Sequence, residues 1–85
     1  MQKNPLVVAT RPGGAELVLL NPETGEFCSF NPTGAWTWEQ LESFKTPAEL
    51  ASAFASHFKV SADIAARDVD AYLGQLRKRG LLREA

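Results

Sequence analysis

Hydrophobic positions along the chain change their spacing at about Phe30, from alternation to the spacing of a helix. Before that point, three short runs of β-branched, aromatic and large aliphatic residues are separated by Pro12-Gly13-Gly14 and by the stretch from Asn21 to Gly25. Runs of this kind between turns that contain Pro and Gly are typical of β-strands. The pattern therefore predicts three strands, at about residues 6–10, 15–20 and 26–30.

Three helices are predicted after the third strand, and each begins at a residue that can cap it. Asn31 stands before a proline, which is favoured in the first helical turn. Thr46 and Glu49 have the spacing of a capping box. Ser61 can cap the last helix, and Gly80 can end it. The helices are predicted at about residues 32–43, 47–58 and 62–79.

The order of these elements predicts an α+β fold. Because all the strands precede the helices, we expect a three-stranded antiparallel sheet that is followed by three helices and covered by them on one face. The turn from Asn21 to Gly25 pairs the second and third strands. A chain of 85 residues is expected to form a single domain, residues 1–85. An edge strand of the sheet would lie beside a helix groove.

Composition and charge exclude several classes of function. Nine basic and ten acidic residues give a net charge of −1 and are spread along the chain, which disfavours generic binding to nucleic acid or membranes. The single Cys28 and single His57 exclude an internal disulfide and a zinc site of several Cys and His residues. The sequence thus assigns no cofactor and no metal. The lack of a signal pattern and of a long apolar run predicts a cytoplasmic location.

Catalysis has few candidate residues. A dyad of Cys28 and His57 is the candidate pairing of nucleophile and base. However, Cys28 stands mid-strand between Phe27 and Phe30, a setting typical of a buried and inert thiol. His57 is expected at the surface. We therefore predict that the protein is not an enzyme.

DNA binding is an alternative, because the second and third helices with the sheet beside them have the order of a winged helix-turn-helix. A recognition helix usually offers basic or amide side chains in its first half. This helix instead carries Asp63, Asp68 and Asp70 there. These carboxylates would repel the phosphate backbone.

Peptide capture by strand addition is the third possibility. The third strand leads straight into the helical layer, and the apolar stripe of the last helix is bordered by Asp68 and Tyr72. The apolar residues of this region also fit a plain core. Trp36 lies about 200° around its helix from Trp38, so the two cannot face the same core. Trp36 is therefore expected to be partly exposed for docking a partner, or to fold onto the N-terminal strand or the following loop.

The order and spacing of several motifs resembles the PqqD-like RiPP recognition elements, which act on ribosomally synthesised and post-translationally modified peptides (RiPPs). The resemblance extends from about Val8 to Leu82. Cys28 stands where the family usually has a large apolar residue, and Trp36 is also less typical. The motifs are LVLLNPETGEFCSFNPTGAWTWEQL, TPAELASAF and DVDAYLGQLRKRGLL.

The resemblance implies a winged helix-turn-helix fold that binds a leader peptide as a strand added to the third strand, beside the last helix. Asp68 would meet a basic or hydroxyl group of that peptide. The implied contact residues are Glu26, Phe27, Cys28, Ser29, Asp68, Val69, Tyr72 and Leu76.

The resemblance also implies partners. We favour the recognition subunit of a split lasso-peptide leader peptidase, which would present the leader to a cysteine peptidase and work beside a macrocyclase. The alternative is the peptide chaperone of pyrroloquinoline quinone synthesis or of another RiPP pathway, in which the partner would be a radical enzyme. A winged-helix DNA-binding protein is the second alternative. An open sheet edge also allows a weak homodimer.

Overall fold

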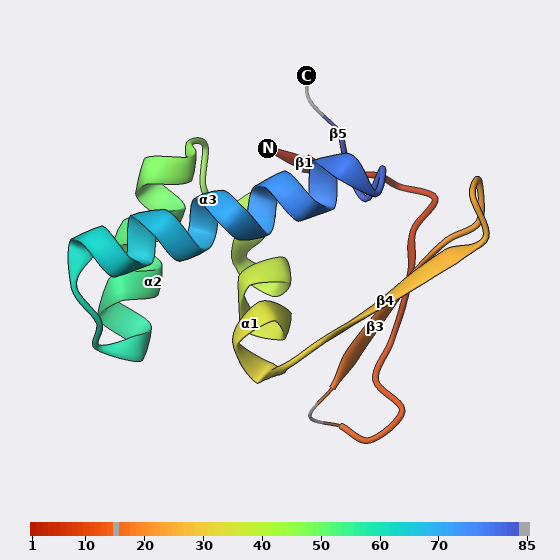
Figure 1. Ribbon diagram of the computed structural model, residues 1–85, viewed down its shortest axis with the longest axis horizontal. Helices are drawn as coiled ribbons and strands as arrows, with labels where there is room; N and C mark the ends of the chain where they lie inside the picture. The colour runs from red at the N-terminus through yellow and green to blue at the C-terminus, as the bar shows by residue number, and fades with distance from the viewer. Residues whose placement is uncertain (15, 84–85) are drawn as a thin grey trace.

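The computed structural model describes residues 1–14 and 16–83, and Figure 1 shows its arrangement. This described part has the predicted α+β fold, with a three-stranded antiparallel sheet and three α-helices. A smaller sheet of two strands joins the ends. The elements are β1 Gln2–Lys3, β2 Val8–Thr10, β3 Leu17–Asn21, β4 Glu26–Phe30, α1 Pro32–Gln40, the 3₁₀ turn η1 Leu41–Ser43, α2 Pro47–Phe58, α3 Ala62–Lys78 and β5 Leu82–Arg83.

The main sheet has the strand order β2-β3-β4, and its strands are all antiparallel. Leu19 in the central strand pairs with Ala9 on one side and with Cys28 on the other. The predicted hairpin is present: the Gly25 N–H donates to the Asn21 C=O over 2.8 Å, and Gly25 has a φ of 75°. That positive φ is the conformation for which a turn favours glycine.

Two strand boundaries differ from the sequence prediction. β2 begins at Val8 instead of near Leu6, because the preceding residues form a turn in which the Val7 N–H donates to the Asn4 C=O. The described part of the second strand begins at Leu17, and the predicted start at residue 15 lies outside the described residues.

The pairing of β1 with β5 was not predicted. Gln2 pairs with Arg83 and Lys3 with Leu82, so the N-terminal strand lies directly against the last described strand. The buried Asn4 fastens the same region, because its side-chain amide donates to the Gly80 C=O over 2.9 Å. Strands of two residues are too short to show a hydrophobic period, so the sequence pattern could not predict them.

All three predicted helix caps are formed. The Asn31 side chain accepts from the Gly34 N–H, and the Ser61 side chain accepts from the Ile64 N–H. Thr46 and Glu49 form the capping box. The first helix is shorter than predicted, because the α-helix ends at Gln40 and the chain continues as η1 to Ser43.

The core lies between the helices and the inner face of the sheet. Leu17, Leu19 and Asn21 alternate along β3 as its buried residues and face the helices. The outer face of the sheet is left open, and Phe27 on that face is 69% exposed. Burying each large aliphatic side chain contributes about 1.5 to 3 kcal/mol, so this core holds the sheet against the helices. The core cluster comprises Leu17, Leu19, Ala35, Trp38, Leu41, Leu50, Ala51, Phe54, Ala65, Val69, Leu73, Leu76, Leu81 and Leu82.

Candidate functional site

The outer edge of β4 has no neighbouring strand in the described part of the chain. The Asn21 C=O accepts from the Gly25 N–H and is therefore directed toward the β4 side. Main-chain groups alternate in direction along an antiparallel pair, so Glu26, Cys28 and Phe30 bond to β3. The N–H and C=O groups of Phe27 and Ser29 consequently point to the open edge, where they are available to an added strand.

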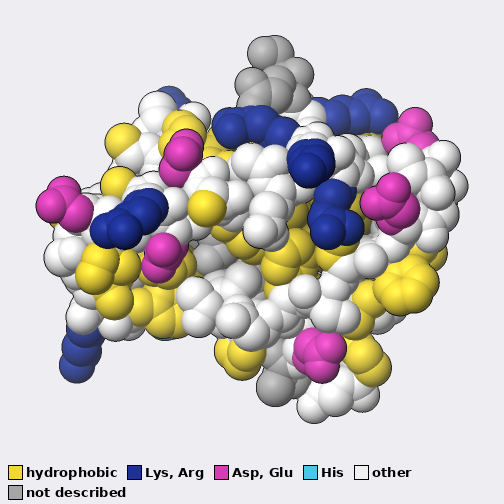
Figure 2. Space-filling model, in the orientation of Figure 1, with side chains coloured by type: hydrophobic (Ala, Val, Ile, Leu, Met, Phe, Trp, Pro, Cys, Tyr) yellow, Lys and Arg dark blue, Asp and Glu magenta, His cyan; other side chains and the backbone are white. Residues whose placement is uncertain are grey.

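A groove runs between this open edge and α3, and we call it the β4–α3 groove. One hollow in it has a volume of about 310 Å³ and includes Phe30 from β4, Gly34 from α1 and Tyr72 from α3 in its wall. A second hollow of about 440 Å³ lies toward the end of α3. Gln75 lines both hollows, so the two are neighbours along α3. Figure 2 shows hydrophobic atoms between α3 and β4, close to Lys and Arg side chains.

Tyr72 fixes the wall of the groove. Its hydroxyl donates to the Gly34 C=O over 2.8 Å, which ties α3 to α1. Its ring meets the ring of Phe30 edge to face, with the ring centres 5.2 Å apart. Burial raises the pKa of the Tyr72 hydroxyl well above its ordinary value, and electrostatic repulsion from the neighbouring Cys28 raises it further. Tyr72 is therefore a neutral hydrogen-bond donor.

Gly34 allows α1 to approach β4 closely. A Cβ atom placed at Gly34 would lie 3.0 Å from the Cβ of Phe30 and 3.1 Å from an atom of its ring. These distances are shorter than ordinary van der Waals contacts between carbon atoms. The absence of a side chain at Gly34 thus lets Phe30 and Tyr72 meet at the groove.

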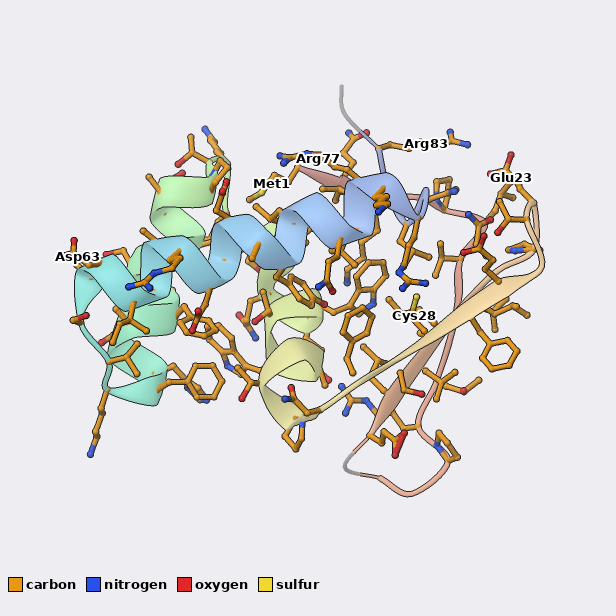
Figure 3. All side chains as sticks on the ribbon, in the orientation of Figure 1. Met1, Glu23, Cys28, Asp63, Arg77 and Arg83 are labelled. Atoms are coloured by element: carbon orange, nitrogen blue, oxygen red, sulfur yellow. The ribbon has the colours of Figure 1, made fainter. Side chains whose placement is uncertain are left out.

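Cys28 lies on the inner face of β4, and Figure 3 shows its side chain in the space between β4 and α3. The expectation of a buried thiol is wrong, because Cys28 is only partly buried. Its strand is at the edge of the sheet, and the side chain packs against the core and lines neither hollow of the groove. Cys28 thus places a small polarizable side chain at this point of β4.

Charged residues stand at the two ends of the groove. Arg79 lies 3.8 Å from a carboxylate oxygen of Glu26, and both side chains are about half exposed. The Asn21 side-chain amide donates to the Arg79 C=O over 3.1 Å and holds the hairpin to the end of α3. Asp68 lines the hollow at the other end and is exposed. Contacts between the hairpin and the end of α3 thus hold the Glu26 end of the groove together, whereas the Asp68 end has an exposed carboxylate.

The eight predicted contact residues do not all reach the groove. Phe27 and Ser29 direct their side chains to the outer face of the sheet, so only their main chain stands at the edge. Val69 is 1% exposed and lines the wall of the first hollow. Leu76 is 0% exposed and lines none of the described hollows, so its prediction as a peptide contact is corrected to a core position.

Several residues of the groove were missed from the sequence. Phe30 was interpreted as core, and Gly34 had no pattern that linked it to the site. Gln75 and Arg79 could have been found, because they follow Tyr72 at three and seven residues and so share its face of α3.

Trp36 lies outside the groove and is partly buried, in agreement with the predicted partial exposure. It packs on α2, which was neither of the neighbours considered for it. Its ring stacks on His57 with the ring centres 4.5 Å apart and meets Phe54 and Phe58 edge to face. His57 is exposed, as predicted. It is engaged by Trp36, whereas Cys28 stands beside the groove.

The described residues also bear on metal binding and on membrane insertion. Across residues 1–14 and 16–83, no group of three or more His, Cys, Asp or Glu side chains could hold a metal ion. Within the same residues, every helix is too short or too polar to cross a membrane.

A family model described as coenzyme PQQ synthesis protein D (PqqD) matches residues 16–82. The chain belongs to the PqqD family. The match covers both groove-forming elements, β4 and α3, and confirms the resemblance to PqqD-like RiPP recognition elements. No curated protein matches this PqqD-family chain.

Solved structures share the fold of this PqqD-family chain over nearly its whole length. One, described as "TbiB1 in Complex with the TbiA(beta) Leader Peptide", is 28% identical, with a TM-score of 0.86, and the match covers 100% of this chain and 98% of that one. Another, "Lasso peptide synthetase B1 complexed with the leader peptide", is 25% identical, with a TM-score of 0.83, and covers 98% and 96%. The winged helix-turn-helix fold predicted from the sequence is confirmed.

Proposed function

We propose that this PqqD-family chain binds the leader peptide of a RiPP precursor as a strand added to β4. The observation that carries the proposal is the open edge of β4, where Phe27 and Ser29 direct main-chain groups beside the β4–α3 groove. The protein performs no chemistry itself and presents the bound precursor to a tailoring enzyme.

In strand addition, main-chain hydrogen bonds supply affinity and side-chain contacts supply specificity. The added strand can form up to four hydrogen bonds at this edge, since the N–H groups of Phe27 and Ser29 donate and their C=O groups accept. Each contributes about 0.5 to 1.5 kcal/mol, which gives affinity without sequence preference. Every second side chain of the peptide then points into the groove, where Phe30, Val69 and Tyr72 offer apolar contact.

The two structural relatives support this proposal, since each is described as a complex with a leader peptide. One of the two descriptions names a lasso peptide synthetase B1, and we therefore favour the lasso system. In that system the partner is a cysteine leader peptidase, and a macrocyclase acts later. The description of the family model favours the alternative, a peptide chaperone of quinone cofactor synthesis with a radical enzyme as its partner.

The partner enzyme would gain from the high local concentration of a precursor that is held nearby. We place its docking surface at Trp36, which forms a partly exposed aromatic cluster with His57 and Phe58. This cluster lies on α1 and α2, so a docked enzyme would leave the β4 edge accessible. The role belongs in the cytoplasm, where ribosomal precursors are made.

The experiment is a titration of the purified protein with a fluorescent peptide of the leader that is encoded beside its gene. Random duplex DNA of similar length is the control ligand. Saturable binding of the peptide and none of the DNA is the expected result. Binding of DNA alone would replace the proposal by the winged-helix alternative.

A further inference from the structure

The two ends of the β4–α3 groove have opposite charges. Asp68 lines one end, and none of the hydrogen bonds or ion pairs of the described residues involves its carboxylate. Lys78 and Arg79 line the other end with Glu26. Because Glu26 already pairs with Arg79, the net charge of that end is +1 and comes from Lys78.

The wall between the charged ends is neutral. Val69 and Tyr72 supply apolar surface there, and Gln75 supplies an amide. The Tyr72 hydroxyl is occupied by the Gly34 C=O, so its ring is the part offered to a ligand. A ligand that complements the whole groove needs a basic group at the Asp68 end, an acidic group at the Lys78 end and an apolar group between them.

The distance between the charges corresponds to a fixed spacing in an extended peptide. Asp68 and Lys78 are ten residues apart on α3, which at 1.5 Å per residue places them about 15 Å apart along the helix. A strand rises about 3.4 Å per residue, so four residues span about 14 Å. Residues i, i+2 and i+4 of a strand share a face, and residue i+2 would lie over Tyr72.

We propose that the groove selects a peptide segment with a basic and an acidic side chain four residues apart and an apolar side chain midway between them. This proposal rests on the proposed function and names the ligand chemistry of the same site. β4 runs from the basic end at Glu26 to the acidic end at Phe30. Antiparallel pairing is the more stable arrangement, so the basic residue precedes the acidic one in the ligand.

The charges would supply a preference for one register and one direction, which main-chain pairing alone does not provide. Hydrogen bonds along an edge form equally well when the peptide slides by two residues, and only slightly less well when it enters in the reverse direction. A reversed peptide would place its carboxylate against Asp68 and its ammonium group against Lys78, and the like charges would repel. The groove thereby fixes both the register and the direction of its ligand.

The test uses two capped fluorescent peptides of about 11 residues with the same composition. One has the sequence Thr-Val-Thr-Lys-Thr-Leu-Thr-Glu-Thr-Val-Thr, and in the other the Lys and Glu exchange places. A single exposed charge pair contributes little. The Lys-first peptide makes two favourable charge contacts, with Asp68 and Lys78, and the exchanged peptide makes two unfavourable ones. The difference predicts binding about tenfold tighter for the Lys-first peptide at low salt. The ratio should fall toward one at about 1 M salt, where screening is short-ranged.

Charge-swapped proteins give a matched control. Asp68→Lys with Lys78→Glu keeps the net charge and should reverse the preference. Asp70→Lys with Arg67→Glu exchanges exposed charges on α3 that line neither hollow, and it should leave the preference unchanged. Helical circular dichroism checks that each variant is folded.

Equal binding of the two peptides, binding of neither, or a preference that survives the Asp68 and Lys78 exchange would overturn the proposal. If the leader encoded beside the gene still binds, only the charge selection fails and the proposed function stands. If that leader also fails to bind, the proposed function fails with it.

Discussion

The main sheet has two edges, and only one of them faces a groove. The β2 edge carries outward main-chain groups at Ala9, by the same alternation that places Phe27 and Ser29 at the β4 edge. All three residues of β2 are exposed, and none lines a described hollow. The comparison teaches that unpaired main chain does not make a binding site by itself. The β4 edge becomes a candidate because α3 stands beside it.

Proline at each edge gives the largest expected contrast. Ser29→Pro removes an outward N–H and should weaken leader binding by about a hundredfold, because it also obstructs the pairing. Ala9→Pro makes the same change at the β2 edge and should leave the affinity within about twofold. Titration with the fluorescent leader measures both. Equal losses of affinity would show that the β4 edge is not the binding edge.

Stability must be measured beside affinity for these two variants. Proline at an edge position removes no ladder hydrogen bond, so both should unfold at similar urea concentrations. A large loss of stability in Ser29→Pro alone would mean that its weak binding reflects unfolding.

Truncation of Tyr72 tests the side-chain half of the site. Tyr72→Ala removes the ring from the groove and should cost about 1 to 3 kcal/mol in leader affinity. Tyr72→Phe keeps the ring and loses only the bond to the Gly34 C=O, so affinity should change little while stability falls by about 1 kcal/mol. Unchanged affinity in Tyr72→Ala would move the groove to the other flank of α3, near Ala66 and Arg77.

The glycines of α1 and α3 offer a further matched pair. Gly34→Ala would press on Phe30 and should destabilise the fold by about 1 to 3 kcal/mol through overpacking. Gly74 has no heavy atom within 4 Å of an added Cβ, so Gly74→Ala should stabilise α3 by up to about 1 kcal/mol. Thermal unfolding compares them. Similar unfolding temperatures would argue against the close approach of α1 to β4.

The smallest effect concerns alkaline pH. The pKa of Tyr72 is raised in the folded protein above the ordinary value of about 10, so the unfolded chain loses its proton first. The stabilisation is complete below pH of about 10 and is lost as the pH rises above it. Tyr72 is the single tyrosine, so tyrosinate absorbance should appear together with unfolding. Tyr72→Phe should lose less stability over the same pH range.

The sequence predicted the elements better than the surfaces. Helix caps and turns depend on residues that are close in the sequence, so they could be predicted from it. The capping box of Thr46 and Glu49 and the turn that ends at Gly25 are examples. Gly34 and Phe30 belong to the site through a contact between α1 and β4 that no local spacing encodes. Leu76 was misplaced because one apolar stripe on α3 serves the core, while the neighbouring face with Tyr72 and Gln75 lines the groove.

The antiparallel pairing of β1 with β5 places the N-terminal strand and the last described strand side by side. A host protein could therefore receive this fold as an insertion through one of its loops, since the chain would enter and leave at a single point. The outward groups of β4 lie on a different sheet from this attachment point. Such a graft would carry the open edge of β4 and the β4–α3 groove into the host with their structure intact.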